Sequence, residues 1–222
     1  MEVSIQDFKN MLLHVQSRIE EQKDYLSELD RALGDGDHGV TMSLGWEAIA
    51  DKVNAFEAED CGLLCKEVAM CFLNAVGSSV GPLYATAFLR GATVLQGKSV
   101  ISKQAMVEFW AAMVKGIQER GKAQLGDKTM LDTWIPAIES LQKAYQEDQE
   151  LIACLGEAVQ AAEQGMESTK NLMSKKGRSS KLGDRALGHQ DPGATSAFII
   201  LSASYEFLKN GSTVAAMNAN TK

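Results

Sequence analysis

Apolar residues recur at steps of three and four along almost the whole chain, and this spacing is what most constrains the fold. In the first segment, six apolar residues follow it: Phe8, Leu12, Val15, Ile19, Leu26 and Leu29. An apolar stripe with this period, with charged residues between its members, is typical of an amphipathic α-helix. We therefore expect one long helix from about Ser4 to Leu33.

The same period returns in seven later segments, each bounded by Gly, Asp, Ser or Pro: residues 40–56, 61–76, 82–96, 103–120, 129–146, 149–172 and 194–209. No convincing alternation of apolar and polar residues separates them. With only 6% aromatic residues and three prolines, the composition also suits helix-on-helix packing. The sequence predicts an all-α fold of about eight amphipathic helices. Short connections favour antiparallel neighbours, so we expect an up-and-down bundle or a closed helical barrel.

The chain of 222 residues is expected to form one domain over residues 1–210. Its last residues, 211–222, are small and polar, and we expect this tail to fray. Two segments depart from the average composition: residues 34–41 are rich in Gly and Asp, and residues 175–192 in Gly, Ser and basic residues. Because helices flank both, we interpret them as functional loops rather than linkers.

A formal net charge of −7 disfavours nucleic acids and anionic membranes as partners. The first residues lack the pattern of a signal peptide, and no run of 18 apolar residues occurs, so we expect a cytoplasmic protein with no membrane partner. The four cysteines show no C-x-x-C spacing, which favours reduced thiols on helices over a metal site.

Three carboxylates within eight positions, Asp30, Asp35 and Asp37, give the strongest chemical signal. The negative charges of such a cluster repel one another unless cations neutralise them. Hard oxygen ligands of this kind select Mg²⁺ or Ca²⁺. Counted from Asp35, the sixth and twelfth positions are Val40 and Trp46, which excludes an EF-hand. Magnesium fits better, with a simple turn and helix cap as the alternative interpretation.

Other signals indicate a phosphate-bearing ligand. Small residues stand before or at predicted helix starts at 77–81 and 191–193, where free backbone N–H groups can bind an anion. Each could also be an ordinary capped helix start. The basic segment 175–181, with Arg178, could fold over phosphates or be a solvated loop. His38 could donate to a phosphate, carry a proton or cap its loop, and Met130 could pack against a base.

The chain has neither a Walker A pattern nor a G-x-G-x-x-G motif after a strand. A nucleotide site here must therefore be built from helices and their connecting loops.

Four stretches carry a resemblance to a known family: LDRALGDGDHGVTM, AVGSSVGPLYATAFLRGA, RGKAQLGDKTMLDTWIPA and KGRSSKLGDRALGHQDPGATSAF. They span roughly residues 29–198. At these residues the chain resembles the nucleotide-binding L subunits of bacterial dihydroxyacetone kinases, in particular the phosphoenolpyruvate-dependent type. The resemblance implies an eight-helix antiparallel barrel with a nucleotide bound at one end.

The resemblance further implies ADP as a tightly bound cofactor held through two Mg²⁺ ions. In this family, a phosphohistidine on the M subunit of a phosphotransferase system converts ADP to ATP in place. The γ-phosphoryl group then passes to dihydroxyacetone on the K subunit. A homodimer is also a family expectation.

Transferred to this sequence, the resemblance implies the following roles. Asp30, Asp35 and Asp37 look like the Mg²⁺ ligands; the nucleotide contacts are implied to be His38, Gly39, Val40, Thr41, Ser78, Ser79, Val80, Gly121, Met130, Arg178, Asp191, Pro192 and Gly193. His38 and Arg178 join the three aspartates in the implied catalytic set.

Other functions stay open at this point. Related domains form part of single-chain kinases that use free ATP, and the substrate could be another short ketose. Family members also act as partners of a transcription regulator that responds to the ADP-bound form. An all-helical metal-dependent hydrolase is an unrelated alternative.

Overall fold

The computed structural model describes the backbone of residues 1–219 and the surroundings of the side chains of residues 1–211. The helices are α1 Ile5–Glu21, α2 Lys23–Leu33, α3 His38–Asn54, α4 Cys61–Ala75, α5 Val80–Leu95, α6 Lys103–Gly121, α7 Leu131–Gln146, α8 Leu151–Ser168 and α9 Pro192–Ala219. Two 3₁₀ helices, η1 Thr169–Asn171 and η2 Arg178–Ala186, lie between α8 and α9. The predicted all-α class is confirmed.

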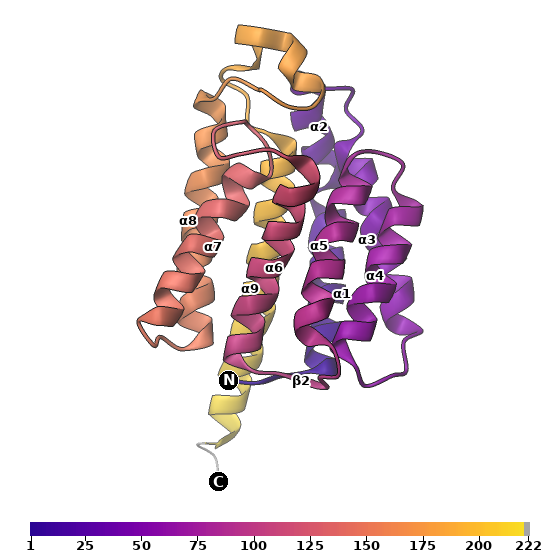
Figure 1. The fold of residues 1–222 in the computed structure, drawn as a ribbon, viewed down its shortest axis with the longest axis vertical. Coiled ribbons are helices and arrows are strands. Elements are labelled where there is room, and N and C mark those ends of the chain that lie inside the picture. The colour runs from indigo at the N-terminus through magenta and orange to yellow at the C-terminus, as the bar shows by residue number, and fades with distance from the viewer. Residues whose placement is uncertain (220–222) are drawn as a thin grey trace.

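Eight long helices close into a ring in the order α1, α3, α4, α5, α6, α7, α8 and α9, with α9 packed back against α1. Successive helices alternate in direction, so this is an up-and-down barrel. The helix α2 packs at one end, against α3 and α9. The N-terminus and the last described turn of α9 lie at the opposite end (Figure 1). The alternation therefore places the N-termini of α3, α5, α7 and α9 together at the end that carries α2.

Large apolar side chains fill the inside of the barrel. Trp110 and Trp134 stack with ring centroids 5.6 Å apart, joining α6 to α7. Phe72 and Tyr84 meet edge to face at 5.6 Å, joining α4 to α5. Such contacts add to the stabilisation that burial of the rings provides. The core is thus continuous around the ring.

The expected single helix over residues 4–33 is wrong at one point. The helix breaks at Gln22, where the backbone has φ −100° and ψ 5°, and α2 begins at Lys23. The backbone carbonyl of Lys23 lies directly against the Cα of Gly39, where a Cβ would have no room. This close contact between α2 and the first turn of α3 is a tertiary effect that the apolar period does not reveal.

The chain also contains a small antiparallel pair that the helical period did not predict. Strand β1, Val3–Ser4, pairs with β2, Val100–Ile101, at the end of the barrel opposite α2 (Figure 1). At the other end of the chain, the backbone of α9 is helical to Ala219, beyond the expected end near residue 209. Residues 220–222 of the expected tail lie outside the described residues.

Within the part of the chain that the structure describes, no helix combines the length and apolar character needed to cross a membrane.

We predict that Phe72→Ala lowers the free energy of unfolding by about 3–5 kcal/mol, because the ring is fully buried and the substitution leaves a cavity between α3, α4 and α5. Leu63→Ala is the matched control on the same helix: its side chain is 40% exposed, and we expect a change within about 0.5 kcal/mol. Denaturant unfolding measures both. Equal effects of the two substitutions would contradict the barrel packing.

Candidate functional site

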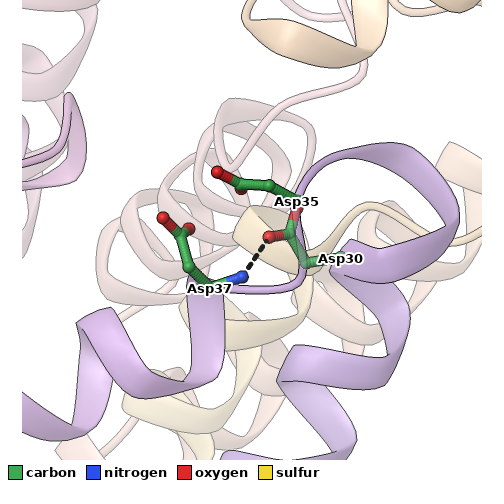
Figure 2. Close-up of side chains that lie close together, drawn as sticks. All are labelled: Asp30, Asp35 and Asp37. Atoms are coloured by element: carbon green, nitrogen blue, oxygen red, sulfur yellow. Dashed lines mark hydrogen bonds between the residues drawn. The ribbon is translucent and has the colours of Figure 1, made fainter.

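The three aspartates predicted from sequence come together at the end of the barrel that carries α2. Asp30 lies in the last turn of α2, Asp35 in the loop that follows, and Asp37 at the N-cap of α3. One carboxylate oxygen from each lies within 4.8 Å of the other two, and Figure 2 shows the three side chains side by side. Hard oxygen donors at this spacing can hold Mg²⁺ or Ca²⁺.

The loop of residues 34–37 is folded around the Asp30 carboxylate. Its Oδ2 accepts hydrogen bonds from the backbone N–H groups of Asp37, at 2.9 Å, and His38, at 3.2 Å. The first of these bonds is drawn in Figure 2. Gly36 takes φ +79°, a conformation that glycine adopts without strain. Asp30 therefore both caps α3 and belongs to the carboxylate cluster, so a helix cap and a cluster of acidic groups coexist here.

A guanidinium group neutralises part of this negative charge. Arg178, at the start of η2, forms an ion pair with Asp35 and lies 3.9 Å from Asp37. The carboxylates of Asp35 and Asp37 are about half exposed, at 49% and 53%. Arg178 of the basic segment 175–181 thus lies against the acidic cluster, a contact that the sequence did not predict.

A cavity of about 770 Å³ opens next to the carboxylates, a size within the range of small-molecule sites. Fourteen of the residues predicted for the site line it: Asp30, Asp35, Asp37, His38, Thr41, Ser78, Ser79, Val80, Gly121, Met130, Arg178, Asp191, Pro192 and Gly193. The N-terminal turns of α3, α5, α7 and α9 all reach it. Backbone N–H groups and helix dipoles at such positions favour an anionic ligand.

Part of the lining is apolar. It is formed by α5, α6 and the start of α7: Val80, Leu83, Ile117, Ala123, Met130 and Leu131. Gly121 lies here, and a Cβ at its position would come within 3.0 Å of the Leu83 side chain. The cavity therefore combines a charged region with an apolar pocket, as a ligand with a phosphate tail and a flat ring system requires.

Two predicted residues do not line the cavity. Gly39 is buried against the Lys23 carbonyl and the Ser27 hydroxyl, so its lack of a side chain serves the packing of α2 on α3. Val40 is 45% exposed on the first turn of α3.

His38 is buried at the base of the cavity, and its Nε2 lies 2.9 Å from the Ser196 hydroxyl on α9. Burial lowers the pKa of the imidazole to about 4, despite the nearby Asp30 carboxylate and a hydrogen bond to the Pro192 carbonyl, which both act to raise it. The ring is neutral at pH 7, and its contacts connect the start of α3 to that of α9.

The segment between α8 and α9 covers one side of the cavity; we call residues 170–190 the lid segment. Four of its residues line the cavity: Lys176, Gly177, Arg178 and Ser179. The lid segment lies across the end of the barrel (Figure 1, orange). Gly177 has φ +67°, which lets the chain turn sharply into η2.

Sequence reasoning missed two buried charged residues beside the cavity, Lys128 and Asp132, and did not foresee that the predicted Asp191 is buried as well. Lys128 lines the cavity but is only 1% exposed, and Asp132 is equally buried in the first turn of α7. Asp191 is buried at the start of α9, where its carboxylate accepts the N–H of Ala194 at 2.8 Å. A lysine within a polar Gly-Asp-Lys loop looks solvent-exposed in sequence, and only its position just before an apolar helix hinted at burial.

Comparison with known proteins places this geometry in a family. Residues 32–206 match the DAK2 domain. The chain belongs to the DAK2 domain family.

Curated relatives of this DAK2 protein include two bacterial kinase subunits. It is 37% identical over 180 residues to the "PEP-dependent dihydroxyacetone kinase, ADP-binding subunit DhaL" of Escherichia coli K12, covering 81% of this chain and 86% of the relative. It is 35% identical over 204 residues to the corresponding subunit of kinase 2 of Listeria innocua, covering 91% and 94%. The resemblance stated from the sequence is confirmed.

Solved structures show the same fold. The crystal structure of the dihydroxyacetone kinase of C. freundii matches with a TM-score of 0.71 at 25% identity, over 89% of this chain and 34% of that longer one. The same kinase in complex with AMP-PNP and Mg²⁺ matches with a TM-score of 0.68 at 26% identity, over 89% and 33%. The DAK2 chain thus corresponds to about a third of that kinase.

We predict that the titration of the Asp191 carboxyl makes the free energy of unfolding depend on pH. Burial raises the pKa of its carboxyl to about 7, and the hydrogen bond from Ala194 N–H opposes the shift. The folded protein therefore binds more protons than the unfolded chain between about pH 4 and 7, and the stabilisation from this group, full below pH 4, is lost as the pH rises to 7.

Asp191→Asn removes this titration while keeping an oxygen that can cap α9. In nucleotide-free protein, we expect the wild type to lose at least about 1 kcal/mol more unfolding free energy than the variant between pH 4.5 and 7.5, since one pKa unit corresponds to about 1.4 kcal/mol. Urea unfolding at both pH values measures the difference. Parallel pH dependence in the two proteins would contradict the assignment.

Proposed function

We propose that this chain is the ADP-binding subunit of a multi-subunit dihydroxyacetone kinase. The observation that carries the proposal is the carboxylate cluster at the mouth of a 770 Å³ cavity ringed by helix starts. It is supported by 35–37% identity to ADP-binding subunits that match over almost their whole length.

The donor set fits magnesium, since Asp30, Asp35 and Asp37 offer three oxygen ligands within 4.8 Å of one another. These residues would hold Mg²⁺, which supplies charge neutralisation to phosphate oxygens when bound. The residues around Thr41, Ser78–Val80 and 191–193 would hold the phosphates through N–H and hydroxyl groups. The apolar pocket with Gly121 and Met130 would take the adenine.

Phosphoryl transfer needs positioning and electrostatic stabilisation more than covalent chemistry from the protein. Arg178 would supply a positive charge where charge develops on the transferred group. The lid segment would exclude water from it, which would favour transfer over hydrolysis. Asp30 would keep the three carboxylates close together, because its carboxylate accepts hydrogen bonds from the backbone of the loop that carries the other two ligands.

In this proposal, dihydroxyacetone is bound on the K subunit, and a phosphohistidine on the M subunit rephosphorylates ADP in place. The product is dihydroxyacetone phosphate. A homodimer and an interaction with a transcription regulator stay predictions.

The direct test combines this chain with a K subunit, ADP, Mg²⁺ and a phosphohistidine-bearing M subunit. We expect dihydroxyacetone phosphate only when all components are present, with free ATP a poor substitute for the M subunit. Steady phosphate release from ATP by the isolated chain would instead support the hydrolase alternative.

We predict that Asp35→Asn and Asp37→Asn each weaken Mg²⁺-dependent ADP binding at least about tenfold, because each removes one charged ligand. Asp51→Asn, on the far half of the same helix α3, is the matched control and should bind like the wild type. Calorimetric titration with and without Mg²⁺ measures the effect. Unchanged binding in both variants would refute the metal assignment.

A further inference from the structure

The ammonium group of Lys128 is surrounded by backbone carbonyls. Its Nζ donates to the carbonyl oxygens of Thr169 at 2.7 Å, Ala186 at 2.6 Å and His189 at 2.6 Å. An ammonium group has three protons, so these three bonds use all of them. The side chain is 1% exposed, and burial lowers the pKa of the amine, which the Asp191 and Asp132 carboxylates oppose.

Two of these three carbonyls belong to the lid segment, near the end that leads into α9, and the third lies directly before its other end. Thr169 immediately precedes it, whereas Ala186 closes η2 and His189 lies just before α9. A single nitrogen therefore ties together the points where the lid segment leaves and rejoins the barrel. Two backbone bonds reinforce the junction: Gly188 N–H donates to the Lys170 carbonyl at 2.8 Å, and Lys175 N–H to that of Asp127 at 3.0 Å.

The backbone at Lys128 is held in an unusual conformation to reach this position. Its φ is +62°, in the left-handed region that non-glycine residues seldom occupy. The Asp132 carboxylate fixes the loop by accepting the N–H groups of Gly126, at 2.6 Å, and Thr129, at 2.7 Å. A strained backbone conformation of this kind persists only where surrounding contacts hold it in place, and such residues are often found at functional sites.

The geometry argues against Lys128 as a direct ligand of phosphate. A lysine at the edge of a nucleotide cavity is commonly such a ligand, but here no proton of the ammonium group remains for one. Its influence on the cavity passes through the lid segment, which carries Arg178, and through the adjoining turn at 191–193.

We propose that Lys128 is a positioning residue that fastens both ends of the lid segment to the barrel and thereby sets how long the bound nucleotide is retained. The retention part rests on the proposed function, since it takes ADP as the ligand. The fastening part concerns this chain alone and can be tested without nucleotide.

The first test is hydrogen exchange of the nucleotide-free protein, comparing peptides from the lid segment with peptides from α4. In Lys128→Met, the three carbonyls lose the hydrogen bonds from the ammonium group. We therefore expect lid amides to exchange about tenfold faster or more through local opening, while exchange in α4 is unchanged. Lys128→Arg keeps the charge, but its planar fork cannot serve three carbonyls that converge on one nitrogen, and it should also loosen the lid segment.

Lys122→Met is the matched control, because Lys122 is another lysine with a left-handed backbone, φ +51°, but is exposed at the end of α6. It should leave lid exchange as in the wild type. Unchanged lid exchange in Lys128→Met would overturn the proposal, and equal acceleration of the lid and α4 in both Lys128 variants would overturn it too.

The second test measures the release rate of ADP with Mg²⁺. We expect Lys128→Met to speed release about tenfold, the lower end of the range for residues that support a binding shell. If Lys128 acts through the lid segment, its effect must shrink when Arg178→Ala is already present, because the two changes are then not additive.

Full additivity, or weaker ADP binding without faster lid exchange, would instead indicate direct contact with the nucleotide and overturn the proposal. A wild-type chain that binds no ADP would refute the proposed function. The hydrogen-exchange result would still decide whether Lys128 fastens the lid segment to the barrel.

Discussion

The Asp30 carboxylate accepts two backbone N–H groups from the start of α3, and the arrangement of the site depends on this interaction. It folds the loop that carries Asp35 and Asp37 back onto α2, so that three like charges lie within 4.8 Å. Without that constraint, their repulsion would spread the loop. The same bonds fix the direction in which α3 starts, and through His38 they connect α3 to Ser196 on α9.

The topology explains why the site lies at one end of the barrel. Alternating helix directions bring the N-termini of α3, α5, α7 and α9 to the end where α2 packs. Helix N-termini favour a phosphate-bearing ligand at that end, and the carboxylate cluster offers oxygen donors to the cation that we propose beside it. Two buried charged residues complete this end. Lys128 donates to three carbonyls in and next to the lid segment, while the Asp132 carboxylate holds the loop before α7.

Much of this could be predicted from the sequence, because apolar period and local motifs report on local structure. The helices from α3 onward begin within about three residues of their predicted positions, and the acidic cluster was correctly singled out. The break at Gln22 could not be predicted, because the apolar stripe runs through it, and the close contact between Gly39 and the Lys23 carbonyl beside it joins residues far apart in the sequence. The role of Lys128 was equally hidden, since its partners lie 41 to 61 positions away along the chain.

We propose that this end of the barrel holds a magnesium-bound adenine nucleotide. The most direct measurement is to purify the chain without added nucleotide, denature it, and quantify released nucleotide by chromatography and magnesium by atomic spectroscopy, beside a sample treated with chelator. We expect near-stoichiometric ADP together with magnesium. Both should be lost on chelation, because a ligand that binds only the folded state, and does so through the metal, dissociates when the metal is removed. A protein that carries neither, and that binds no ADP when Mg²⁺ is supplied, would contradict it.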